Sequence, residues 1–293
     1  MGPSPELETY RTLRLGMAAS GVLLLVAVVF VVWVSRQVPG SVSATYYGLI
    51  TSIFVGTLVS VGLALVAVKG RPGWENGLMD AAGVLIPMVA LVPTPIEDSS
   101  CPTDTECVPI GIIPALQVNV SAYLAVGAIA LGYLWLRRWR EGSTGHPWAR
   151  DTTTGVAAVS ALWGLTLVVF AWAQELFLTY AHYVSAIGFF VILILVVFIN
   201  ARSGAVDNPA VAKPKTWYRR QYNFIAWGMV LFVGTGGFMF WWTRRQNPGL
   251  LIPTIEPFPV IFWVEVALLI LFIYYWIIQT TELWNETVPG ENP

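Results

Sequence analysis

The sequence predicts an all-α fold, a bundle of about eight transmembrane helices that forms a single membrane domain over residues 1–293. Of the 293 residues, 56% are hydrophobic and 11% are charged, whereas soluble domains carry about 25% charged residues. Apolar runs of about 20 residues recur along the chain, which is the length that a helix needs to cross the hydrocarbon layer. These runs are predicted helices because lipid offers no partner to an open backbone N–H or C=O group.

The first four predicted spans cover residues 15–34, 47–68, 77–92 and 118–136. The first is uncharged and longer than the apolar core of a cleaved signal peptide, so it is predicted to be retained. The second ends at Lys69 and Arg71. The third is short, has Asp80 near one end and contains Pro87, which removes a backbone donor and predicts a kink. Arg137 begins the basic stretch that ends the fourth span.

The other four predicted spans cover residues 153–174, 176–201, 222–242 and 258–278. The first two of these apolar runs meet at Glu175, so a tight turn is predicted there. The basic stretch 213–220 precedes the seventh span, where it fits contact with anionic lipid. A polar and acidic tail, residues 279–293, follows the eighth.

Basic residues predict the orientation, because short cytoplasmic loops carry an excess of Lys and Arg. Eight spans place both termini on one side of the membrane. With that side in the cytoplasm, thirteen of the sixteen Lys and Arg residues lie on cytoplasmic segments, and Arg36, Arg244 and Arg245 lie outside. The sequence therefore predicts cytoplasmic termini, a cytoplasmic tail at 279–293 and an extracytoplasmic loop at 93–117.

The two cysteines, Cys101 and Cys107, both lie in this loop. A disulfide between them would close a short loop on an oxidising face of the membrane. The alternatives are two free thiols, or a pair of metal ligands without further partners nearby. The predicted side of the loop favours the disulfide.

Polar side chains at the predicted outer ends of the spans are the candidate site. Glu265 and His182 each lie about seven residues into a span, where an ionisable group costs about 2.5–3.5 kcal/mol and usually faces the bundle interior. One interpretation is a ligand pocket in which these two residues pair, and the other is a structural clasp between helices. The candidate ligand-binding residues are Glu265, His182, Asn119, Tyr46, Tyr47, Gln117 and Glu175.

Several function classes lack support in the sequence. The net charge of −1 argues against nucleic acid as a partner. A phosphate-binding loop, a nucleophile elbow and a dinucleotide fingerprint are all missing. His182 is the one histidine within a predicted span, so ligation of haem by two histidines is excluded there, and no metal or cofactor is expected. At the inner ends, Asp80, Asn200, Gln279 and Glu282 are interpreted as interfacial caps and salt-bridge partners.

Short sequence similarities between the two halves of the chain are compatible with a four-plus-four internal repeat. The pair at 45–46 matches the pair at 179–180, and the triplet at 133–135 parallels that at 274–276. Chance matches between apolar helices are the alternative.

Four stretches of the sequence resemble those of a known protein family. They are SVSATYYGLITSIFVGTLVSVGLALVAVKG at 41–70, ENGLMDAAGVLIPMVALVPTP at 75–95, and residues 181–186 and 279–284. They resemble a family of uncharacterised actinobacterial multi-span membrane proteins, which implies a multi-pass protein of the bacterial plasma membrane and no established activity. Asp80 departs from the asparagine expected there. Membrane hydrolases of the alkaline ceramidase type do not fit, because their zinc site is built on several histidines.

The leading functional hypothesis is a non-enzymatic protein that binds a lipid or small amphiphile in an outer-leaflet pocket, as a sensor or accessory subunit. The expected partners are membrane lipids and other membrane subunits. The alternatives are a proton-coupled transporter that uses Glu265 and His182, a membrane hydrolase, and a purely structural subunit of a membrane complex.

Overall fold

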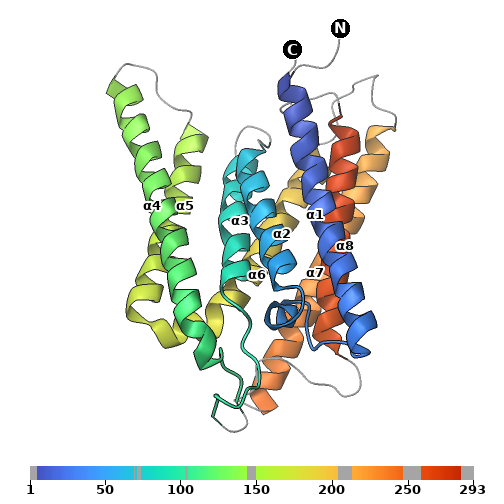
Figure 1. The fold of residues 1–293 in the computed structure, drawn as a ribbon. Helices are drawn as coiled ribbons and strands as arrows, with labels where there is room; N and C mark the ends of the chain where they lie inside the picture. The colour runs from blue at the N-terminus through green and yellow to red at the C-terminus, as the bar shows by residue number, and fades with distance from the viewer. Residues whose placement is uncertain are drawn as a thin grey trace.

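The computed structural model describes residues 5–68, 70, 74–102, 105–143, 150–203, 213–246 and 259–284, and these residues contain no strand. Most of them belong to long helices (Figure 1). The α-helices are α1 (Pro5–Ser35), α2 (Thr51–Ala67), α3 (Trp74–Leu91), α4 (Ile113–Ser143), α5 (Arg150–Trp172), α6 (Gln174–Ser203), α7 (Lys215–Gln246) and α8 (Val260–Glu282). Two short 3₁₀ helices are η1 (Ser43–Tyr47) and η2 (Ile110–Ile112).

The length and composition of the helices indicate an integral membrane protein. Among the described residues, six helices are long and apolar enough to cross a membrane, namely α1 and α4 to α8. The apolar helix α2 has 17 residues, which at about 1.5 Å per residue is a little under the thickness of the hydrocarbon layer. The number of spans, the side of the termini and the internal repeat stay predictions.

Six of the described helices form a closed ring, in which α1, α2, α3, α6, α7 and α8 each pack against the next and α8 packs against α1. All six contribute buried apolar residues to one core inside this ring. The α4–α5 pair stands to one side of the ring and packs on it mainly through contacts of α5 with α3 and α6, with a smaller contact of α4 with α3 (Figure 1). The start of α1 and the end of α8 lie at the same end of the bundle, opposite the loop that follows α3 (Figure 1).

Close packing of α2 and α3 depends on a glycine from each helix. A Cβ atom added at Gly62 would lie 2.8 Å from the carbonyl oxygen of Gly83 and 2.6 Å from the ring of Pro87. Pro87 lies inside α3, which remains helical on both sides of it. Small residues at this contact allow two backbones to approach closely, which suits helices that pack in lipid.

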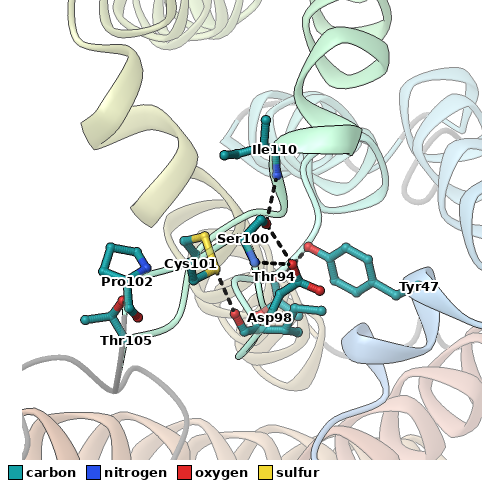
Figure 2. Close-up of a disulfide and its surroundings, with 10 residues drawn as sticks. Tyr47, Thr94, Asp98, Ser100, Cys101, Pro102, Thr105 and Ile110 are labelled. Carbon is teal, nitrogen blue, oxygen red and sulfur yellow. Dashed lines mark hydrogen bonds between the residues drawn. A yellow bond between two sulfur atoms is a disulfide. The ribbon is translucent and has the colours of Figure 1, made fainter.

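Cys101 and Cys107 form the predicted disulfide, with a Cα–Cα distance of 5.7 Å (Figure 2). Ile96 and Cys107 exchange two backbone hydrogen bonds of 3.0 Å, which pair the two sides of the loop. Ser100 donates its hydroxyl and its backbone N–H to Asp98, and these bonds lower the pKa of the Asp98 carboxyl. The loop therefore has a defined structure of its own.

The helices differ from the predicted spans mainly at their ends. Helix α1 begins at Pro5 rather than at residue 15, and α8 continues to Glu282, so the first residues of the predicted tail are helical. Tyr47 belongs to η1, because a turn separates it from the start of α2 at Thr51. The predicted features at Lys69, Arg71, 258 and 285–293 lie outside the described residues.

Candidate functional site

Two cavities lie inside the ring in the part of the chain that the structure describes. The first, of about 100 Å³, is lined by α1, η1, α2, α3, α6 and α8, and the second, of about 120 Å³, by α6, α7, α8 and the segments at Ser41 and Thr94. The two cavities share Ala186, Phe190 and Glu265 in their walls. Glu265 is the one carboxylate that faces either of them among the described residues, so we take it as the centre of the candidate site.

The segment between α1 and α2 supplies the hydrogen bonds to Glu265. The backbone N–H groups of Val42 and Ser43 donate to Oε2 at 2.5 and 3.2 Å, and the Ser43 hydroxyl donates to Oε1 at 2.9 Å. Both N–H groups stand at the start of η1, where a helix leaves its first donors without internal partners. We call residues 41–47 the clasp segment, because it closes over the carboxylate.

Local hydrogen bonds hold the clasp segment in this shape. The Ser41 hydroxyl accepts the N–H of Ala44 at 2.9 Å, and the Thr45 hydroxyl donates to the carbonyl of Val42 at 2.6 Å. These are the short-range side-chain bonds by which Ser and Thr favour turns and helix starts. Ser41, Val42, Ser43 and Thr45 are all buried, so the clasp segment belongs to the interior of the protein.

His182 is buried, with 2% of its surface exposed, and lies on α6 where it meets the end of α3. Its Nδ1 atom is 2.7 Å from the carbonyl oxygen of Val92. Because a carbonyl can only accept, Nδ1 carries the hydrogen in this bond. His182 therefore fixes the point at which the chain leaves α3.

Two tyrosines hold the same exit from α3. The hydroxyl of Tyr47 donates to the carbonyl of Thr94 at 2.8 Å (Figure 2), and the hydroxyl of Tyr183 shares a 3.0 Å hydrogen bond with the Thr94 side chain. Thr94, Tyr183 and His182 also line the second cavity. These hydrogen bonds of the polar wall run to the carbonyls of Val92 and Thr94 and to the Thr94 hydroxyl, so its anchors are uncharged groups.

The structure brings some of the predicted site residues together and leaves others apart. Glu265 and His182 line the second cavity together, but each is bonded to backbone groups, and the described residues show no hydrogen bond between the two. Tyr47 does not line this cavity itself, but its hydroxyl donates to the carbonyl of Thr94, which does. Tyr46 is half-buried and packs edge-on against Tyr47 and Phe54.

The other three predicted residues lie away from the cavities. Asn119 is exposed and Gln117 half-buried on α4, which stands outside the ring. Glu175 is exposed in the first turn of α6. The sequence missed Ser43, Thr94 and Tyr183, although the Ser-Val-Ser stretch at 41–43 before an apolar run is a detectable signal for a polar turn.

A second polar cluster lies inside the opposite end of the ring. Asn200 of α6 donates to Glu75 of α3 at 3.2 Å and to the hydroxyl of Tyr275 of α8 at 3.1 Å, and Gln279 also donates to this hydroxyl at 2.9 Å. Nearby, Tyr222 of α7 donates to Glu282. Rather than capping at an exposed interface, Asn200, Gln279 and Glu282 are buried.

Arg14 of α1 joins this end of the ring, although the sequence gives no sign that it is buried. Its guanidinium donates to the carbonyl of Leu283 at 3.1 Å, and only 1% of its surface is exposed. Glu75, with 2% exposed, was equally missed. A buried charge requires paired or hydrogen-bonded surroundings, and helices distant in the sequence supply them here.

The structure shows no evident metal site either around Glu265 or in the second polar cluster, since no three described His, Cys, Asp or Glu side chains are grouped closely enough to hold a metal ion. Comparison of the chain with protein-family models, curated proteins and solved structures finds no match. Any function must therefore be argued from the geometry of the ring and its cavities.

Proposed function

We propose that this integral membrane protein binds a small amphiphile inside the ring, as a sensor or accessory subunit, with the polar end of the ligand at Glu265. The observation that carries this proposal is a carboxylate that faces two adjoining cavities with otherwise mostly apolar walls. Ligand sites are typically apolar hollows in which a few polar groups fix the orientation.

The hydrogen bonds of Glu265 indicate which polar end would fit. An ionised carboxylate has about four acceptor positions, and the clasp segment fills three of them. The remaining position can accept one hydrogen bond from a ligand in the cavity. A donor such as an alkylammonium group fits this position and also balances the negative charge of the partly buried carboxylate.

The walls and the volume indicate the rest of the ligand. Phe190, Phe232 and Phe240 face the second cavity, and aromatic faces attract a cation as well as an apolar chain. An apolar cavity of about 150 Å³ admits benzene, so cavities of about 100 and 120 Å³ each admit a somewhat smaller group, and a ligand of about nine non-hydrogen atoms would have to extend through both. A short-chain amine or an amphiphile with a small cationic end has this size.

The first experiment measures thermal unfolding of the purified protein with three probes of equal chain length, namely hexylammonium, hexanol and hexanoate. We expect hexylammonium to raise the unfolding temperature most, because its cationic donor complements the Glu265 carboxylate. A ligand at 100 times its Kd stabilises the folded state by about 2.7 kcal/mol. Glu265→Gln should remove this preference, and Glu175→Gln, at an exposed carboxyl of α6, should retain it. Equal stabilisation by hexanoate would contradict the proposed polarity.

Native mass spectrometry of gently solubilised protein provides a test that assumes no ligand. We expect a bound cationic or donor-bearing amphiphile that Glu265→Gln loses. If the preparation carries no small molecule and none of the three probes stabilises it, a purely structural role is favoured for Glu265 and the clasp segment.

A proton-coupled transporter is the second candidate, and the position of the second polar cluster favours it. Glu265 and Gln279 lie fourteen residues apart on α8, about 21 Å along the helix, with Phe272 between them in the wall of the first cavity. Polar and ionisable groups inside a membrane protein often mark a proton path, and here they lie at both ends of an apolar ring interior. A proton on Glu265 would replace one acceptor with a donor and weaken the hold on the clasp segment.

Transport and binding can be distinguished in proteoliposomes that contain a pH-sensitive dye. Transport predicts proton flux that both Glu265→Gln and Glu75→Gln abolish in protein that still folds. Binding alone predicts no flux, with the probe preference intact in Glu75→Gln.

A further inference from the structure

A third apolar hollow, a groove, lies on the outer surface of the ring between α1 and α8, at the end of the bundle that carries the clasp segment. This groove has a volume of about 490 Å³, larger than either interior cavity. Its walls include Val29 and Trp33 of α1, which are 60% and 61% exposed, and Trp263 of α8. Exposed apolar side chains on a membrane-spanning helix face lipid, so the groove opens toward the bilayer.

Arg36 lies at the head of the groove and is the one charged residue among the described residues that line it. It follows the last residue of α1, and its N–H donates to the carbonyl of Val32 at 3.0 Å. Within the described part of the chain, its guanidinium has no hydrogen bond and no ion pair. A cation at the end of an apolar channel, with its donors available, complements an anionic headgroup.

The backbone at Arg36 supports a specific role for its side chain. Its φ angle is 57°, in the left-handed region, and a helix that ends in this conformation usually has glycine there. A side chain at such a position is strained. The chain nevertheless places a guanidinium at this point, directly above the groove.

The length of the groove matches one leaflet. Its walls extend from Leu25 of α1 to Arg36, just after the end of this helix, a separation of eleven residue steps or about 16 Å. Half of a hydrocarbon layer about 30 Å thick is about 15 Å. An acyl chain in this groove would therefore place its headgroup at the level of Arg36, beside Trp33, in the zone that tryptophan side chains favour.

From these observations we infer that the groove between α1 and α8 is a phospholipid site, in which one acyl chain lies along the groove and the lipid phosphate binds Arg36. This site is separate from the one proposed around Glu265, because it lies on the outside of the ring. Guanidinium groups suit phosphate because they can donate two parallel hydrogen bonds.

The test compares retention of phosphatidylglycerol and of diacylglycerol with the same acyl chains, by native mass spectrometry of the detergent-solubilised full chain. We expect the protein to retain one phosphatidylglycerol more strongly than diacylglycerol. Arg36→Gly should lower this retention about fivefold, the effect of one arginine near anionic lipid. Because glycine adopts a φ of 57° without strain, this variant should fold at least as well as the wild type.

A second variant, Val29→Phe, fills the groove and should lower retention of both lipids. Matched controls are Arg245→Gln, which removes another arginine far from the groove in sequence, and Val126→Phe, which enlarges an exposed valine of α4. Both controls should retain lipid as the wild type does. The inference would be overturned by equal retention of the two lipids, or by unchanged retention in Arg36→Gly and Val29→Phe. An equal loss of lipid in the controls, or a second copy of the chain held in place of lipid, would also overturn it.

Discussion

The hold of Glu265 on the clasp segment predicts a large loss of stability when its carboxylate is removed. In Glu265→Leu the buried N–H groups of Val42 and Ser43 lose their acceptor. A buried donor without a partner costs about 1–3 kcal/mol, and the Ser43 hydroxyl can rotate toward another acceptor, so only the two N–H groups are counted. We therefore expect the free energy of unfolding to fall by about 4 kcal/mol.

The isosteric variant Glu265→Gln distinguishes the hydrogen bonds from the charge. Its amide oxygen can still accept from both N–H groups, and its NH₂ group can donate to the Ser43 hydroxyl oxygen. Only the strengthening by charge is lost, so the expected fall is about 1–2 kcal/mol.

Unfolding by sodium dodecyl sulfate, followed by far-UV circular dichroism, measures both variants. Glu175→Leu replaces an exposed carboxyl and should stay within about 0.5 kcal/mol of the wild type. The reasoning is refuted if Glu265→Leu unfolds with the control, or if Glu265→Gln is as unstable as Glu265→Leu. Either result would show that the carboxylate does not hold the clasp segment.

Two further predictions concern the packing and the loop. Gly62→Ala would place a Cβ 2.6 Å from the ring of Pro87 and should lower the free energy of unfolding by about 1–3 kcal/mol. The control Gly56→Ala, on the same helix, adds a Cβ with nothing within 4 Å and should raise the free energy of unfolding by about 0.5–1 kcal/mol. The same denaturant titration compares the two, and a loss in both would contradict the packing argument. Replacing Cys101 and Cys107 by serine opens a loop with a sequence separation of 6 and should lower the free energy of unfolding by about 2 kcal/mol without changing the helical circular dichroism signal. A loss of helical signal would show that the loop also organises the bundle.

The amino-acid sequence alone was enough to predict the class of the protein, most of its helices and its disulfide. Apolar runs long enough to cross a bilayer must become helices, because lipid cannot satisfy an open backbone. The two cysteines are six residues apart in a polar loop, so their pairing needs little information from the rest of the chain. The sequence also indicated that Glu265 and His182 face the interior, since ionisable groups in such runs are rare and usually do so, and both line the second cavity.

The tertiary structure decided which helices enclose the site and what the polar groups bind. Asn119 lies on α4, outside the ring, and hydropathy could not show this, because lipid-facing and interior surfaces of a membrane helix are both apolar. The main partners of Glu265 are backbone N–H groups at Val42 and Ser43; the sequence signals a polar turn there, but not that this turn binds Glu265. The burial of Arg14 and Glu75 likewise follows from contacts between helices far apart in the chain, and only the closed ring brings those helices together.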